Sequence, residues 1–441
     1  MQLTQSELRT PPHRRSLLLA VAVATFLVAT ANGGIAIGAG ADPNQTDTDR
    51  AERPDRDKKK KNNDEKELED TTSKHAGLEF AGYNDSDHVS VVTPSIHAGI
   101  ENVSGASLNA SYLVDVVSAA SADIVSTASR RWEEVRQAGT LSGQYKPHDL
   151  GVGVGGSVSS EDDYLSYGVY AMVIKDFAEK NWTANFGYGF SHDTAGRCGT
   201  GGACTPFSVF SRDLQRGSFN AGLSWVVDRS TLASMSMDVI LENGDQSKPY
   251  RYIPMFSPQV AQLVPKGASI DAVNAHRLPE RPLEQLPLER HRVALSLRYA
   301  HRFEDSTIRL EERFYDDDWG LIASTSDARW IFDLGRRFAV WPHGRFHAQT
   351  SVSFWQLAYV SNQGLGTGWD LPLYRTGDRE LGPLWTAEGG GGLRWYLGGE
   401  RDPRSVQLGA TVDGMYTAFT NDLYLTSRTG ILGALTLEVE W

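Results

Sequence analysis

Apolar and polar residues alternate along most of the chain from residue 89 to the C-terminal end. In the segment 291–303, every second residue from Val293 to Tyr299 is apolar, and the residues that face the other way include two arginines. The same alternation recurs in the segments 183–190, 233–241 and 345–354. Because successive side chains of a β-strand point to opposite faces of a sheet, a period of two predicts strands with one apolar and one polar face.

The alternating segments are longer than the strands of most soluble proteins. Each covers about 10–14 residues, whereas strands of soluble proteins usually have about 5–6. A tilted strand that crosses a bilayer needs about 9–11 residues, with one face toward lipid and the other toward a polar interior. The pattern therefore predicts an all-β protein, a closed antiparallel transmembrane β-barrel of about 14 strands, within a range of about 12–16.

The predicted strands place the connections on two sides of the barrel. If the last strand ends in the periplasm, the long connections 194–216, 244–289 and 357–383 all lie outside the cell, and short turns lie on the periplasmic side. The connection 119–148 breaks this rule, because it would be long and periplasmic. It contains a candidate helix at 130–137, so we expect a plug, a segment beneath the barrel, or an error in the strand count.

The N-terminal region predicts export. Residues 1–31 have the order of a signal peptide, with basic residues, an uncharged apolar run at 16–28 and then small residues. The run is short for a membrane-spanning helix, and no second long apolar stretch follows, which excludes a helical inner-membrane protein. Residues 32–88 are expected to be a disordered charged linker, because so few apolar residues cannot offset the entropy of the chain. The barrel domain is expected over residues 89–441.

The C-terminal strand ends on an aromatic residue. Leu435, Leu437, Val439 and Trp441 share one face of this strand. The pattern resembles the signal by which outer-membrane barrels are handed to their insertion machinery, whereas an ordinary closing strand would not require a terminal aromatic residue. We therefore expect a location in the outer membrane of a Gram-negative cell, with outer-membrane lipid and the barrel-insertion machinery as partners.

Charge and cysteine content narrow the picture further. The formal net charge is −12 and no strongly basic face is present, so we expect no nucleic-acid partner. Cys198 and Cys204, the two cysteines of the chain, lie close together in a glycine-rich segment. This pair predicts a disulfide formed in an oxidising compartment. A metal or redox pair is the alternative, but the segment lacks further ligands and the CxxC spacing.

Three segments stand out beside the alternation. They are Val114–Ser121 with its echo at 123–129, Ser157–Ser166, and Arg313–Gly320 followed by the strand 346–354. The third contains the sequence Tyr-Asp-Asp-Asp-Trp-Gly at 315–320. Together they resemble a family of uncharacterised proteobacterial outer-membrane β-barrel proteins with a hairpin motif of this type. Gln349 matches the family, whereas Trp355 stands where a Tyr is commoner. The resemblance implies a barrel in the outer membrane and no established activity.

Few residues suggest a cation site or an enzyme. Asp316, Asp317 and Asp318 form a candidate cation site, since Ca²⁺ prefers oxygen ligands, and a solvated acidic turn is the alternative. The acidic residues at 161–163 allow the same two interpretations. The adjacent His192 and Asp193 resemble an acid–base pair of a rim hydrolase, but neighbours on a strand point to opposite faces. We therefore expect neither an enzyme nor a cofactor.

The predicted inner faces carry a patch of mostly positive charge. Its residues are Arg292, Arg298, Arg309, Glu311, Arg313, Arg345 and His347. Such a lumen would favour anionic solutes, unless Arg–Glu pairs close it. The sequence thus supports a porin-like channel or a transport-related barrel of unknown substrate. A non-conducting structural or surface-interaction barrel is the alternative, and a rim hydrolase is a third.

Overall fold

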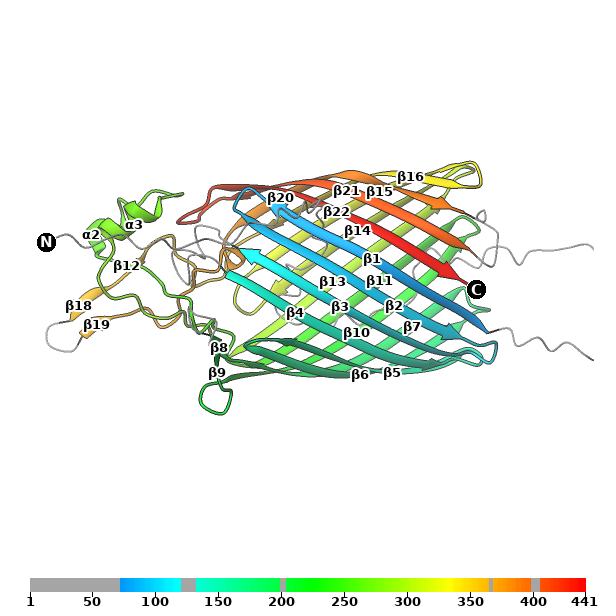
Figure 1. Cartoon of the computed structure of the whole chain (residues 1–441), viewed down its shortest axis with the longest axis horizontal. Coiled ribbons are helices and arrows are strands. Elements are labelled where there is room, and N and C mark those ends of the chain that lie inside the picture. Colours follow the sequence, from blue (N-terminus) through cyan, green and yellow to red (C-terminus); the bar gives the residue numbers. More distant parts are fainter. Residues whose placement is uncertain (1–71, 120–131, 199–203, 365–367, 398–404) are drawn as a thin grey trace, which may run out of the picture.

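The computed structural model describes residues 72–119, 132–198, 204–364, 368–397 and 405–441. Sixteen strands are joined side by side in one closed barrel (Figure 1). The barrel strands are β1 (Ser73–Asp85), β2 (Val89–Glu101), β3 (Ala106–Ala119), β4 (Trp132–Tyr145), β5 (Leu150–Glu161), β6 (Tyr164–Phe177), β7 (Trp182–Ala195), β10 (Arg212–Asp228), β11 (Thr231–Gly244), β13 (Glu289–Arg302), β14 (Ser306–Asp317), β15 (Ile322–Leu334), β16 (Phe338–Gln349), β20 (Leu384–Tyr396), β21 (Val406–Phe419) and β22 (Ser427–Glu440). The connections contain β8 (Arg197–Cys198), β9 (Cys204–Thr205), β12 (Met255–Phe256), β17 (Tyr359–Val360), β18 (Asn362–Gly364), β19 (Gly368–Asp370), α2 (Pro258–Ala261), α3 (Ile270–His276) and a 3₁₀ turn, η1 (Arg379–Leu381).

The first strand closes the barrel by pairing with the last. β1 runs antiparallel to β22, and Leu78 lies opposite Leu437. Each barrel strand therefore has a hydrogen-bonded neighbour on both sides, and the sheet has no free edge. The predicted closed antiparallel all-β barrel is confirmed.

The barrel has sixteen strands rather than about 14, which is the upper limit of the expected range. One missed strand is β1, which begins at Ser73, so the barrel starts earlier than the expected residue 89. Leu78 and Phe80 are the large apolar residues of its outer face, which makes the alternation too short to stand out. Residues 1–71, with the expected signal peptide and most of the expected linker, lie outside the described residues.

The other missed strand is β4. The candidate helix at 130–137 is wrong in its described part, because residues from Trp132 onward form an extended strand. Its outer face carries Val135, Leu141 and Tyr145, but Gln137, Gly139 and Gly143 lie between them, which weakens the alternation. Because β4 occupies residues 132–145, the long periplasmic connection expected at 119–148 is not present as such. β3 ends at the same end of the barrel as the other long connections.

The two ends of the barrel differ in their connections. At the turn end, where β1 begins and β22 ends, the strands are joined by short turns, at 102–105, 146–149, 178–181, 229–230, 303–305 and 335–337. At the loop end, the longer connections are 196–211, 245–288 and 350–383. Figure 1 shows this end on the left, with α2 and α3 extending beyond the strands. The predicted distribution of long and short connections over the two ends is thus present.

The outer face of the barrel is apolar. Large hydrophobic side chains on it are solvent-exposed in every part of the wall, among them Leu78, Ile96, Val154, Val169, Phe186, Met237, Leu297, Phe314, Phe346, Val412 and Leu435. Aromatic residues gather near the turn end, where Trp182 stacks on Trp225 and Phe338 stacks on Trp395. An apolar band with aromatic residues at its margin is the surface that a membrane barrel presents to lipid.

Much of the buried apolar core lies at the loop end. The connections 245–288 and 350–383, which together we call the cap, pack on one another, and β12 pairs with β17. Ile253, Met255 and Phe256 are almost completely buried there. None of the helices in the described part of the chain is long and apolar enough to cross a membrane.

The orientation of the strands predicts unequal effects for two neighbouring residues of β11. Met237 is exposed on the outer face, and Ser236 points into the barrel. Met237→Arg should lower the free energy of unfolding in lipid vesicles by about 2–4 kcal/mol, because it places a charge near the bilayer midplane. Ser236→Arg should cost much less. Guanidinium titration followed by tryptophan fluorescence measures both, and equal losses would contradict the assignment of the two faces.

Candidate functional site

The interior of the barrel, which we call the lumen, has two unlike walls. Toward the turn end, β3–β7 and β10 contribute mainly small neutral side chains. Examples are Ser111 and Thr140, whose hydroxyls lie 2.7 Å apart, and Asn185, which donates to Asn220 at 2.8 Å. The wall from β13 to β21 carries arginines, histidines and carboxylates instead.

The register places all seven residues of the predicted charged patch on the inner faces of β13, β14 and β16. Several are paired with carboxylates. Arg298 lies 3.0 Å from Glu311, Arg313 lies 3.4 Å from Asp238, and Arg345 lies 3.7 Å from Glu388. These pairings between strands are not predictable from local sequence, because they depend on the register of the strands.

The lumen is open to solvent at the height of the Arg298–Glu311 pair. Both side chains point inward, yet they are 56% and 36% exposed. On the opposite wall, the inward-facing Ser111 and Thr140 are exposed as well. Ion pairs therefore do not fill the barrel at this level.

At the loop end the lumen wall carries a buried network, which we call the charged ring. Arg216 lies 2.9 Å from Asp193 and 2.8 Å from Glu242. Glu242 is also 2.6 Å from Arg292. Side-chain exposure in this group does not exceed 11%. Breaking such a pair would leave a buried charge without compensation.

The charged ring continues around the same end of the barrel. Arg290 binds Asp317 at 2.5 Å and lies over the buried Trp319 ring, 4.2 Å from its centroid. Further along, Arg136 lies 3.8 Å from Asp115, and Arg428 lies 3.9 Å from Asp85. Each pair joins two neighbouring strands of the barrel, and the Arg428–Asp85 pair joins the last strand to the first.

A second group of charges holds the cap together. Arg251 lies 3.2 Å from Glu284 and 2.9 Å from Asp378, and so connects the two long connections. Burial alone would raise the pKa of Asp378, but Arg251 holds that pKa below its usual value. Gln349, at the end of β16, donates to the carbonyls of Glu380 and Gly382 at 2.9 and 2.7 Å. The cap is therefore anchored to the barrel wall.

The three aspartates of the candidate cation site do not converge. Asp316 lies on the outer face, Asp317 is bound to Arg290, and Asp318 lies 2.8 Å from His291. The candidate cation site is therefore not assembled, because successive strand residues point to opposite sides.

A different acidic group is present in the described part of the chain. Glu134, Glu161 and Asp163 place one carboxylate oxygen each within 4.8 Å of one another. Burial and the Glu161 charge raise the pKa of Asp163, whereas the nearby positive charge of Lys248 lowers it. Lys248 thus supplies positive charge to this group.

His192 and Asp193 also point to opposite faces. His192 lies on the outer side near the Tyr167 ring, whereas Asp193 is bound to Arg216. They do not form the acid–base pair of a rim hydrolase. In the connection 196–211, a disulfide joins Cys198 and Cys204. On β22, Leu435 and Leu437 face outward beside β1, and Trp441 is 51% exposed.

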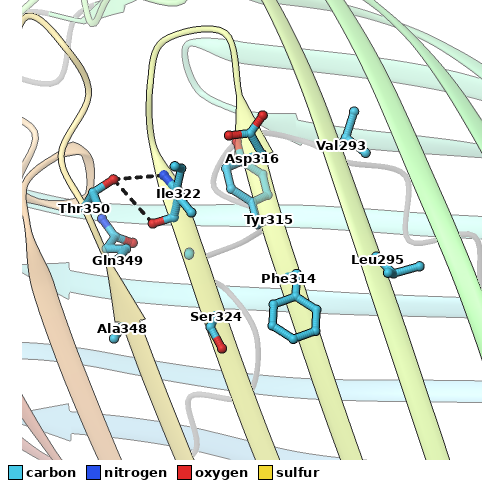
Figure 2. A pocket seen from close by; sticks show the side chains of 11 residues that line it. Val293, Leu295, Phe314, Tyr315, Asp316, Ile322, Ser324, Ala348, Gln349 and Thr350 are labelled. Atoms are coloured by element: carbon cyan, nitrogen blue, oxygen red, sulfur yellow. Dashed lines mark hydrogen bonds between the residues drawn. The ribbon is translucent and has the colours of Figure 1, made fainter.

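A recess of about 590 Å³ lies on the outer wall and not in the lumen (Figure 2). Phe314, Ile322 and Leu295 line it, together with the smaller Ser324 and Ala348. Thr350 hydrogen-bonds to the backbone of Ile322 at its rim. Because its outer-face residues point away from the lumen, it is separate from any path through the barrel.

Sequence reasoning missed a second lumen feature near the turn end. Trp341 of β16 points inward and lies between Arg329 and Arg394. These residues follow the same period of two as the predicted patch. Their proximity depends on the register of three strands, which local sequence does not specify.

Solved structures with a related shape are distant from this chain. The siderophore receptor PirA from Acinetobacter baumannii is 12% identical, with 79% of this chain and 53% of that chain covered at a TM-score of 0.37. OccK11 (OpdR) from Pseudomonas aeruginosa is 10% identical, with coverage of 84% and 96% and a TM-score of 0.38. The CymD monoaromatic hydrocarbon channel is 8% identical, with coverage of 84% and 88% and a TM-score of 0.38. This chain thus spans about half the length of the first, and none of the three likenesses assigns a function.

Sequence comparison is more informative than the structural likenesses. No curated protein matches the chain. Residues 51–397 match the family described as Protein of unknown function (DUF3570). The match covers most of the barrel, in agreement with the expected uncharacterised family, while the importance of the hairpin motif at 315–320 stays a prediction. The chain therefore belongs to the DUF3570 family of proteins of unknown function.

Proposed function

We propose that the protein is a channel of the Gram-negative outer membrane, with a transport-related role and an unknown substrate. One observation carries the proposal: inward-facing side chains such as Arg298 and Glu311 are exposed to solvent in a closed barrel whose outer face is apolar. Barrels of about 16–18 strands enclose an aqueous channel, whereas barrels of about 8 strands are filled by side chains. Sixteen strands therefore favour a lumen that passes water and small solutes.

The same proposal gives the barrel an orientation. Outer-membrane barrels have short periplasmic turns and longer outer loops, so the turn end would face the periplasm. The cap, the charged ring and the disulfide would then lie on the cell surface. The expected signal peptide at 1–31 and the insertion signal at Leu435–Trp441 fit this route.

The charged ring would control access from outside. Arginine and carboxylate side chains oppose one another where the cap approaches the wall. Positive and negative charges beside a low-dielectric mouth create a local electric field. This field favours polar solutes over apolar ones, and it discriminates among polar solutes by their charge distribution.

A non-conducting surface-interaction barrel is the second candidate. The cap favours it, because this part of the chain has its own buried core around Phe256 and exposes Leu263 (79%) and Leu288 (59%). An ordered outer surface with exposed leucines suits a partner protein. Conductance separates this candidate from a channel.

Reconstituted into planar bilayers, the full chain should produce discrete steps of ion current. In Thr140→Cys, the cysteine faces the hydrated lumen, and a negatively charged methanethiosulfonate should attach there and reduce each step. In Leu141→Cys, the cysteine faces outward, and the reagent should leave the steps unchanged. Cys198 and Cys204 are joined and do not react. A bilayer that stays sealed at all voltages would count against the channel.

Arg251→Met should loosen the cap without unfolding the barrel. The substitution leaves the buried Glu284 and the partly buried Asp378 without their shared cation, and the loss of the partner of a buried charge costs about 3–5 kcal/mol. We expect faster proteolysis within 245–288 and larger current steps, with unchanged heat-modifiable migration on gels. Glu280→Gln, which alters an exposed charge of the cap, is the control. Equal proteolysis of both variants would show that Arg251 does not hold the cap.

A further inference from the structure

We propose that the lumen holds a binding site for small organic carboxylates, formed near the turn end by Arg329, Trp341 and Arg394. The three residues lie on the inner faces of β15, β16 and β20. The site deepens the proposed function, because it names the class of solute that would pause in the channel. We call it the Trp341 site.

The two arginines flank the same indole. The guanidinium carbon of Arg329 and that of Arg394 each lie 5.9 Å from the centroid of the Trp341 ring. On β15, Arg329 lies opposite His343, which follows Trp341 by two residues on β16. On β20, Arg394 lies opposite Ala339, which precedes Trp341 by two residues. The register therefore fixes two cations on either side of one aromatic ring.

The indole of Trp341 occupies the space left by the absence of a side chain at Gly392. Gly392 lies directly opposite Trp341 on β20. A Cβ atom built on Gly392 would lie 2.3 Å from Cζ2 of Trp341, so the indole occupies space that any other residue would fill. Glycine inside a strand weakens it, and often marks a close approach of another group. The Trp341 ring is thus held against the wall by the local sequence.

The charge balance of the Trp341 site differs from that of the rest of the lumen. The arginines of the charged ring, and Arg298 and Arg345, lie near carboxylates. Among the described residues, neither Arg329 nor Arg394 forms an ion pair. The nearest acid on the same face of β15 is Asp327, which lies 2.9 Å from His343 and interacts with Arg329 only at longer range.

Positive charge is concentrated here rather than dispersed. Arg309 lies directly opposite Arg329 on the neighbouring strand, and like charges in such positions repel one another. The Nε atom of Arg329 is buried without a hydrogen-bond partner in the described structure. An anion in the lumen would supply the missing acceptor and reduce the repulsion.

The chemistry of the three side chains selects the ligand. A guanidinium binds a carboxylate through two parallel hydrogen bonds, and an indole face binds a flat apolar group. A carboxylate that carries a planar apolar group uses both features, whereas inorganic phosphate uses the arginines alone. Benzoate is therefore the probe, with acetate and phosphate as comparisons.

Equilibrium dialysis of radiolabelled benzoate against the purified full chain in detergent tests the Trp341 site. We expect the double variant Arg329→Gln/Arg394→Gln to bind at least about tenfold more weakly, since two charge-assisted hydrogen bonds are lost. Arg229→Gln, which removes an exposed cation from the turn 229–230 at the same end, should bind like the native chain. Trp341→Leu should weaken benzoate binding and leave acetate binding unchanged. Heat-modifiable gel migration verifies that each variant is folded.

Each result supports or overturns the Trp341 site independently of conduction. Unchanged affinity in the double variant, or an equal loss in Arg229→Gln, would overturn it. Phosphate should displace benzoate more easily from Trp341→Leu than from the native chain. Equal displacement from both would show that the Trp341 ring does not bind the apolar group of benzoate. Arg329→Lys/Arg394→Lys, which keeps both charges but loses the planar forks, should still bind more weakly than the native chain. If benzoate binds but no current is seen in bilayers, the site stands and the channel proposal fails.

Discussion

The pairing of β1 with β22 is the constraint on which the rest of this molecule depends. In a bilayer, backbone N–H and C=O groups have no water to bond, so a sheet can lie there only if it has no edge. The two strands meet over eleven residues, from His75 opposite Glu440 to Asp85 opposite Gly430. Closure also turns one face of every strand to the outside, so the exposed hydrophobic residues of the strands lie on the outer face and their buried charges lie on the inner face. Glu312 is an exception, because it lies on the outer face and accepts hydrogen bonds from Ser324 and Ser326.

Closure at sixteen strands sets the character of the interior. The lumen is too wide for side chains to fill, so polar residues line it and arginines find partners across neighbouring strands. Where the barrel is open, as at Arg298 and Glu311, such a pair stays hydrated and contributes little to stability. Where the cap covers the wall, as at Arg216 and Glu242, the same kind of pair is buried and each charge depends on the other. The Trp341 site departs from both, because neither of its two arginines forms an ion pair with a carboxylate of the described chain.

The cap shows how a membrane barrel can gain a hydrophobic core. The barrel wall carries one small apolar cluster among the described residues, around Tyr83 and Leu432, and most of its large apolar side chains face outward. The connections 245–288 and 350–383 supply one outside the sheet, around Phe256 and Tyr359, and Arg251 joins them through two carboxylates. Gln349 ties this structure to the wall. A wide lumen and an ordered cover over one mouth are thus separate features of one chain.

The sequence by itself determined the fold class and the face on which each strong strand places its residues. A period of two is a local property, so Val293 and Arg298 are assigned to opposite faces without knowledge of their neighbours. Strands with few large outer residues escaped this reasoning: β1 relies on Leu78 and Phe80, and β4 on Val135 and Leu141. Only the tertiary structure decided which inward residues meet. The pairing of Arg216 with Glu242, the divergence of Asp316 and Asp317, and the two arginines around Trp341 all depend on the register between strands. That register is determined by the pairing of all strands in the closed sheet, and it cannot be predicted from the sequence of one strand.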